Sequence, residues 1–81
     1  MSNTIDKHVG AQIKALRTAR GVSQEKLAEA CGITFQQIQK YEKGINRVSC
    51  GRLWQIACAL EVELPYFFPA VDGVNYHPVQ R

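Results

Sequence analysis

The chain has 81 residues and a formal net charge of +3, which fits one small domain that buries about 60% of the surface exposed by its unfolded chain. A domain of this size has little room for a large catalytic pocket. No apolar run approaches the roughly 20 residues of a membrane span, and the first residues lack the basic and apolar regions of a signal peptide, so we expect a cytoplasmic protein without a membrane segment.

The N-terminal part of the chain has the periodicity of an amphipathic helix. Its apolar residues recur at spacings of four, four and three residues, at Ile5, Val9, Ile13 and Leu16. This pattern predicts a helix from about Ile5 to Arg20 that ends at Gly21. On this helix we expect three basic side chains to be exposed, namely Lys7, Lys14 and Arg17.

A second, shorter helix is predicted after Ser23, which is a favourable N-cap residue. Leu27, Ala28 and Cys31 form its apolar stripe. Gly32 follows the stripe and can adopt the left-handed conformation that ends a helix. The chain is therefore expected to turn sharply at Gly32.

A third helix is predicted directly after this turn. Thr34 and Gln37 have the spacing of a capping box, and Gly44 closes the helix. Ile38 marks its inner side. Three long side chains fall on its outer side at positions i, i+4 and i+7, namely Gln36, Lys40 and Lys43.

The outer side of the third helix has the chemistry of a surface that reads DNA. Glutamine can pair with the edge of adenine, and lysine can reach guanine or phosphate in the major groove, which admits a helix. Many surface helices carry glutamine and lysine without binding DNA, so this helix alone leaves both interpretations open. The preceding helix and the tight turn favour a helix-turn-helix that reads DNA.

The net charge is concentrated around this third helix. Residues 34–52 carry four basic residues against Glu42 alone, whereas basic and acidic residues balance in the rest of the chain. The four are Lys40, Lys43, Arg47 and Arg52. A neutral body with one basic end suits attraction to phosphates, although a solvated charged face would have the same composition.

The remaining sequence predicts two more helices. One starts near Ser49 and has an apolar stripe of Leu53, Ile56, Ala57 and Leu60, widened by Trp54 and Cys58. A last helical turn covers Leu64 to Phe68, with proline in its first turn. No strand alternation occurs, so we predict an all-α domain of five helices in residues 1–68. The tail, residues 69–81, has no periodicity and is expected to be flexible.

The three cysteines do not indicate a disulfide framework, a zinc site or an enzyme. Their number is odd, and they lack C-x-x-C or cysteine–histidine ligand spacing. We expect Cys31 and Cys58 to be buried on apolar faces as reduced thiols, and Cys50 stays unassigned. No oxyanion loop supports a cysteine–histidine nucleophile pair, so we expect no catalysis, no cofactor and no metal.

The order of these helices resembles the Cro/C1-type helix-turn-helix family of phage repressors, also called xenobiotic-response-element-like regulators. The most specific shared elements are the R-x-x-x-G-x-S-Q-E-x-L-A run from Arg17 to Ala28, the Gly32-Ile33-Thr34 turn, Ile38, and the Y-E-K-G run from Tyr41 to Gly44. The resemblance covers about Ile5 to Phe68. It implies a five-helix, lambda-repressor-like fold with the helix-turn-helix in its second and third helices.

The resemblance also implies roles in DNA binding. The helix from Thr34 to Lys43 would enter the major groove. The base-reading positions would be Gln36 and Lys40, with Phe35 and Gln37 beside them. Contacts to the DNA backbone would come from Gln24, Thr34, Lys43, Asn46 and Arg47.

Two further expectations concern side chains beside this helix. Phe35 projects about 60° from Ile38 on a helical wheel, so it can pack against the edge of the core or touch a thymine methyl group, and partial packing is favoured. Arg17 and Glu42 occupy positions that pair across helices in relatives of this family. We therefore expect a salt bridge that supports the reading helix.

These features imply a sequence-specific transcriptional regulator, most simply a repressor, that binds double-stranded DNA as a homodimer at a pseudo-palindromic operator. The aromatic segment from Pro65 to Phe68 could close either the core of one chain or an interface with a partner. Two alternatives stay open. One is an antitoxin that binds a toxin protein through this segment and the tail, and the other is a restriction-modification controller protein.

Overall fold

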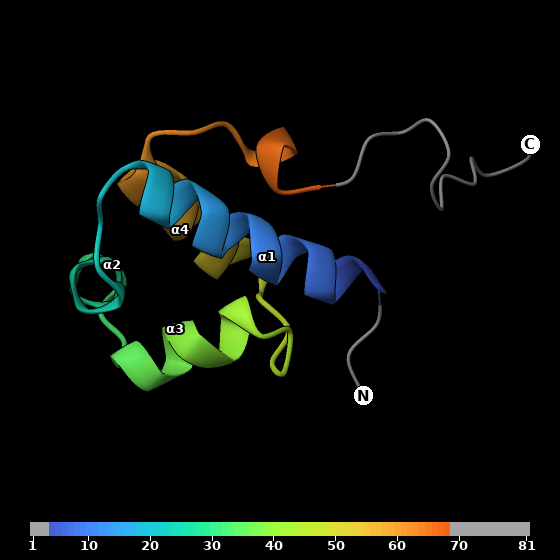
Figure 1. The fold of residues 1–81 in the computed structure, drawn as a ribbon, viewed down its shortest axis with the longest axis horizontal. Coiled ribbons are helices and arrows are strands. Elements are labelled where there is room, and N and C mark those ends of the chain that lie inside the picture. Colours follow the sequence, from blue (N-terminus) through green and yellow to red (C-terminus); the bar gives the residue numbers. More distant parts are fainter. Residues whose placement is uncertain (1–3, 69–81) are drawn as a thin grey trace, which may run out of the picture.

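The computed structural model describes residues 4–68, which form four α-helices and one short 3-10 helix (Figure 1). The helices are α1 (Thr4–Ala19), α2 (Gln24–Cys31), α3 (Phe35–Glu42), α4 (Cys50–Leu60) and the 3-10 helix η1 (Leu64–Phe67). The described residues contain no strand, which confirms the all-α class. No helix in this part of the chain is long and apolar enough to cross a membrane. The tail predicted at residues 69–81 lies outside the described residues.

The fifth predicted helix is present as a 3-10 turn rather than an α-helix. The N–H of Phe68 donates to the carbonyl of Pro65 at 3.1 Å, which is the i to i−3 bond of a 3-10 helix. A segment of four residues is too short for a regular α-helical ladder, and the tighter turn satisfies its backbone. The described residues therefore form four α-helices and one 3-10 turn, not five α-helices.

Both ends of α2 have the predicted caps. Ser23 Oγ accepts a hydrogen bond from the N–H of Lys26 at 3.0 Å and so caps α2. Gly32 has a φ of 70°, a left-handed conformation in which glycine carries no steric penalty. The following N–H, of Ile33, then donates to the carbonyl of Ala28 at 3.0 Å. These bonds end α2 and direct the chain into α3 within three residues.

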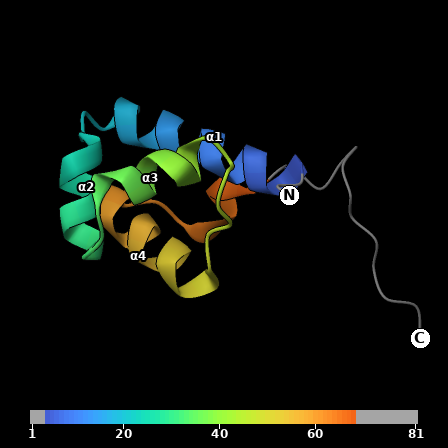
Figure 2. The same ribbon diagram turned by 90° about the horizontal axis from the view of Figure 1, so that it is seen from below.

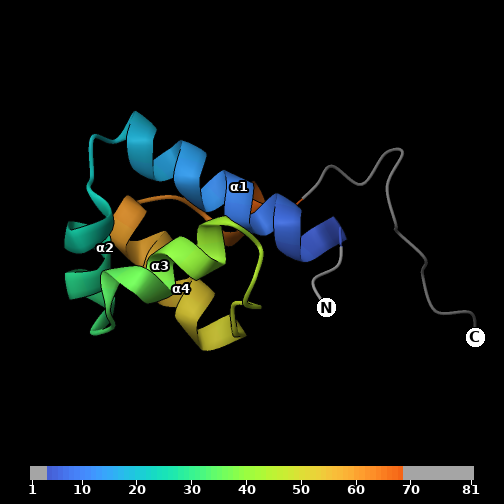
Figure 3. The same cartoon turned by 60° about the horizontal axis from the view of Figure 1, so that its bottom comes forward.

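The core lies between the four α-helices and η1. Its largest fully buried side chains are Ile13, Leu27, Ile38, Ile56, Leu60 and Phe67. α3 packs against α1 and α2, α4 packs against α2 and α1, and η1 packs against α1 and α4. In Figure 1, α3 forms the lower edge of the molecule. Figures 2 and 3 show it in front of α1 and α4, so no other described element covers its outer side.

α1 and α3 approach each other at Gly10. A Cβ atom built on Gly10 would lie 2.2 Å from the carbonyl oxygen of Tyr41 and 3.0 Å from that of Glu42. Since both neighbours are backbone atoms, only glycine allows the two helices to come this close. The contact fixes the C-terminal end of α3 on α1. No sequence pattern marks it, because the atoms that Gly10 meets belong to another helix.

Three side chains differ from their predicted positions. Arg17 was expected to be exposed, but it is only 8% exposed because it turns inward toward Glu42. Trp54 and Cys58 were expected to widen the buried stripe of α4, but Trp54 is 60% exposed and Cys58 is exposed as well. The inner side of α4 is already filled by other apolar residues, namely Leu53, Ile56, Ala57 and Leu60.

Candidate nucleic-acid interface

α3 has an apolar inner side and a polar outer side. Ile38 and Tyr41 are buried in the core. Gln36, Lys40 and Lys43 are exposed and share the outer side, at the spacing that the sequence predicts. The structure thus brings three long polar or cationic side chains together on one exposed surface. Figure 3 shows the ribbon of α3 with its outer side facing away from the rest of the domain.

The start of α3 is anchored by its cap and by one aromatic side chain. Thr34 Oγ1 accepts a hydrogen bond from the N–H of Gln37 at 3.3 Å. Phe35 is half-buried and packs against the core, which is the arrangement that the sequence analysis favours. Gln37 is half-buried beside it. The first turn of α3 is therefore held in place, and its polar residues start from a defined position.

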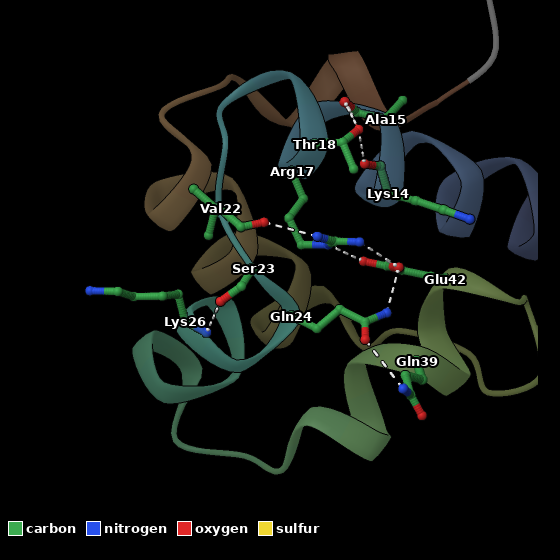
Figure 4. A network of polar contacts seen from close by, with 10 residues as sticks. All are labelled: Lys14, Ala15, Arg17, Thr18, Val22, Ser23, Gln24, Lys26, Gln39 and Glu42. Carbon is green, nitrogen blue, oxygen red and sulfur yellow. Dashed lines mark hydrogen bonds and ion pairs between the residues drawn. The ribbon is translucent and has the colours of Figure 1, made fainter.

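The C-terminal end of α3 is held by an ion pair with α1 (Figure 4). Arg17 Nε lies 2.6 Å from Glu42 Oε2, and Arg17 Nη2 donates to Glu42 Oε1 at 3.2 Å. The third donor, Arg17 Nη1, bonds to the carbonyl of Val22 at 2.8 Å. The side chains of Arg17 and Glu42 are 10% and 4% exposed. This forked, buried geometry joins α1, the loop before α2 and α3.

Two glutamines extend this ion pair. Gln24 Nε2 donates to Glu42 Oε1 at 3.1 Å, and Gln24 Oε1 accepts from Gln39 Nε2 at 3.2 Å (Figure 4). Gln24, predicted to contact the DNA backbone, is thus tied to α3 within the protein. The sequence analysis did not assign a role to Gln39. The one signal in the sequence was the position of Gln39 at the edge of the polar side of α3, because its partner, Gln24, lies on another helix.

The ion pair also changes the charge of the exposed surface. Glu42 is the one acidic residue in residues 34–52, and Arg17 neutralises it below the surface. The outer side of α3 therefore presents Lys40 and Lys43 without a competing carboxylate of its own helix. Arg52 does not join them, because its Nη1 donates to the carbonyl of Cys31 at 2.7 Å and to Gln55 Oε1 at 2.9 Å.

The loop after α3 holds the other predicted backbone contacts. Asn46 is half-buried, and its N–H donates to the carbonyl of Lys40 at 3.4 Å. Arg47 extends into solvent with its side chain 70% exposed, and its Nε lies 3.2 Å from Oδ2 of Asp6 on α1. Although the side chain of Asp6 is only 14% exposed, the guanidinium of Arg47 lies largely in solvent and can exchange Asp6 for a phosphate.

In this arrangement α3 packs against α1 and α2 and leaves its polar outer side exposed, which defines a helix-turn-helix DNA-binding domain. The helix-turn-helix family HTH_3 matches residues 13–67, and the chain belongs to this family. Its members are Cro/C1-type DNA-binding transcriptional regulators rather than enzymes.

Relatives with the same domain are named as transcriptional regulators. The chain is 58% identical over 66 residues to the HTH-type regulator y4wC of Sinorhizobium fredii, covering 82% of this chain and 46% of that protein. It is 56% identical over 71 residues to an HTH-type regulator of Rhizobium meliloti, covering 88% and 51%. A transcriptional regulator in the ATPase CF(0) region of Rhodospirillum rubrum is 53% identical over 68 residues, covering 84% and 63%. The chain spans about half the length of the first two of these relatives.

Solved structures with the same fold include DNA-binding regulators. The restriction-modification controller protein C.AhdI of Aeromonas hydrophila has a TM-score of 0.73 at 34% identity, covering 76% of this chain and 94% of that chain. The DNA-binding domain of BldD has a TM-score of 0.74 at 28% identity, covering 85% and 100%. The clp gene regulator ClgR of C. glutamicum has a TM-score of 0.77 at 25% identity, covering 80% and 84%.

Proposed function

We propose that this protein is a sequence-specific repressor that reads the major groove of double-stranded DNA with α3. The observation that carries the proposal is the open outer side of α3, where Gln36 and Lys40 project from a helix whose only acidic residue is neutralised from within. A helix of this width fits the major groove, and amide and ammonium groups match the hydrogen-bonding edges of bases there.

Each proposed contact has one of two roles. Gln36 and Lys40 read base edges, and Gln37 and Phe35 complete the reading surface at the start of α3. A second group binds phosphates and fixes the register of the protein on the duplex without reading sequence. This group consists of Gln24, Thr34, Lys43, Asn46 and Arg47.

The proposal includes a homodimer on a pseudo-palindromic operator in the cytoplasm. One small module buries limited DNA surface, whereas two modules on half-sites about one turn apart multiply specificity. The aromatic residues of the segment from Pro65 to Phe68 have different environments. Phe67 is fully buried in the core, while Tyr66 and Phe68 are exposed. The two exposed rings are available to a partner, whether a second copy or another protein.

A restriction-modification controller is the second candidate. It is favoured by the likeness to C.AhdI, since the aligned region covers 94% of that compact controller protein. Such a controller would bind DNA with the same surface of α3, so the two candidates differ in the genes that they regulate rather than in the site.

The test is selection from a randomised duplex library at physiological salt. Phosphate contacts alone do not enrich a sequence, so enrichment reports base reading. We expect two inverted half-sites about one helical turn apart. Recovery of single half-sites would remove the dimer from the proposal. No enrichment would overturn the DNA-reading function and leave a protein partner, such as a toxin, as the main ligand.

A further inference from the structure

Gln39 lies at the end of a chain of hydrogen bonds that starts at Arg17 (Figure 4). Glu42 accepts from Arg17 and also from Gln24 Nε2, at 3.1 Å. Gln24 Oε1 then accepts from Gln39 Nε2 at 3.2 Å. The chain connects α1, the first residue of α2 and the polar edge of α3. Gln24 is thereby held on both sides of its amide group.

The carboxylate sets the direction of every bond in this chain. Glu42 is ion-paired with Arg17 and can only accept hydrogen bonds, so Gln24 must turn its nitrogen toward Glu42. The oxygen of Gln24 then faces Gln39, which must offer its nitrogen. Reversing either amide would set two acceptors against each other. The ion pair therefore fixes which atom of the Gln24 amide and which atom of the Gln39 amide is the donor.

Among the described residues, this arrangement uses one of the two N–H groups of Gln24 Nε2. An amide nitrogen carries two donors, and Glu42 takes only one of them. Gln24 is the first residue of α2, at the position proposed above for a phosphate contact. A side chain that is already held loses less conformational entropy on binding, so the remaining donor is preorganised.

We propose that Gln39 is a positioning residue for DNA binding, which holds the amide of Gln24 so that its second N–H donates to a backbone phosphate. The proposal rests on the DNA-binding function proposed above. Gln39 acts through Gln24 and not on the DNA itself. Its removal should therefore change one phosphate contact and leave base preference as it is.

The experiment uses the full chain and the duplex that the unchanged protein selects from a randomised library. Three variants are compared at fixed salt: Gln24→Met, Gln39→Met and the double variant. Methionine keeps the length of glutamine and removes the amide. A hydrogen bond to a charged oxygen predicts about tenfold or more weaker binding for Gln24→Met. We expect Gln39→Met to weaken binding about threefold to tenfold, and the double variant to bind no more weakly than Gln24→Met.

Phosphate-ethylation interference gives the second measurement. For the unchanged protein, ethylation of one phosphate in each half-site should weaken binding. We expect Gln24→Met and Gln39→Met both to lose this sensitivity, at the same phosphate. The matched control is Gln55→Met on α4, which removes one hydrogen bond, the bond that Gln55 Oε1 accepts from Arg52 Nη1 at 2.9 Å. Thermal unfolding is followed for each variant. If Gln39→Met does not fold, Gln39→Ala takes its place, because alanine favours a helix.

Two results would overturn the role of Gln39. One is binding and interference by Gln39→Met equal to those of Gln55→Met. The other is a double variant in which both losses multiply, since Gln39 would then act independently of Gln24. Failure of the proposed function is distinct, because the unchanged protein would then select no duplex and both proposals would fall. If it selects a duplex that Gln24→Met binds equally well, this inference fails together with the phosphate contact proposed for Gln24, while base reading by α3 stands.

Discussion

The ion pair between Arg17 and Glu42 is buried, so removing one of its partners should cost more stability than it does in an exposed pair. Exposed pairs contribute under about 1 kcal/mol, whereas removal of one partner from a buried pair costs about 3–5 kcal/mol because the other charge is left in the interior. We expect Arg17→Ala to lower the free energy of unfolding by about 3 kcal/mol in urea denaturation. Lys14→Ala, on the exposed side of the same helix, is the control. Equal losses in the two variants would contradict the role of burial.

Gln36 is the residue at which base reading is most directly tested. It is exposed on the outer side of α3, and its amide can pair with one base edge. We expect Gln36→Ala to weaken binding to the selected duplex by about 1–3 kcal/mol and to relax preference at one base position. Binding titrations on the selected duplex and on single-base variants of it measure both effects. An equal loss on selected and random DNA would show that Gln36 does not read sequence.

The three cysteines differ in environment, and their reactivity should follow. Burial raises the pKa of the Cys31 thiol, and the nearby Arg52 lowers it less. Cys50 and Cys58 are exposed. We expect iodoacetamide to label these two rapidly near pH 8.5, and Cys31 only when the domain unfolds. Mass spectrometry of the labelled protein measures this order, and rapid labelling of Cys31 in the folded protein would contradict it.

The same pKa shift has a consequence for stability. A folded-state pKa above the unfolded value means that the folded protein holds the Cys31 proton more tightly. The contribution of this thiol to stability is therefore complete below the unfolded pKa, for which the reference value is 9.0, and is lost as the pH rises through the folded pKa.

At the scale of the elements, the contact between α1 and α3 at Gly10 sets how closely these two helices pack. In most helix interiors, replacement of glycine by alanine is stabilising by up to about 1 kcal/mol. Gly10→Ala should have the opposite sign, because its Cβ would lie 2.2 Å from the Tyr41 carbonyl oxygen. We expect a destabilisation of about 1–3 kcal/mol as the two helices are forced apart.

Gly51 provides a matched control on α4. A Cβ atom at Gly51 would meet nothing within 4 Å, so we expect Gly51→Ala to raise stability. Urea denaturation of the two variants gives the comparison. A gain in stability for both would show that α1 and α3 are free to separate at Gly10.

Helix starts and ends were largely predictable, because they depend on local chemistry. Ser23 and Thr34 cap their helices with their own side chains, and Gly32 adopts the left-handed conformation because it has no side chain. The nature of η1 was less predictable, since periodicity over a few residues does not distinguish an α-helix from a 3-10 helix. The exposure of Trp54 was not predictable at all, because a helical wheel does not show how wide a face the neighbouring helices cover.

At the scale of the whole molecule, the proposed DNA binding depends on the basic surface formed by α3 and the loop that follows it. Arg47 is exposed, and its Nε pairs with Asp6. If Arg47 neutralises one phosphate, Arg47→Ala should weaken binding to all sequences alike. It should also make the slope of log K against log salt concentration shallower by about one unit.

Arg20→Ala is the control for this charge change. Arg20 Nη2 donates to the carbonyl of Glu61 at 3.2 Å, so it lies at the end of α4 away from the reading helix. We expect its salt slope to match that of the unchanged protein. If both arginine variants changed the slope equally, attraction would depend on total charge rather than on the surface around α3.

The sequence by itself determined the helices, the sharp turn at Gly32 and the polar side of α3, because caps and periodicity act over a few neighbouring residues. It also placed the excess charge near α3. The family resemblance predicted that Arg17 pairs with Glu42. Only the tertiary structure decided that this pair is buried, that Gly10 lets α1 touch α3, and that Gln39 holds Gln24. Each of these contacts joins residues on different helices, so its geometry depends on how the helices pack and not on local sequence.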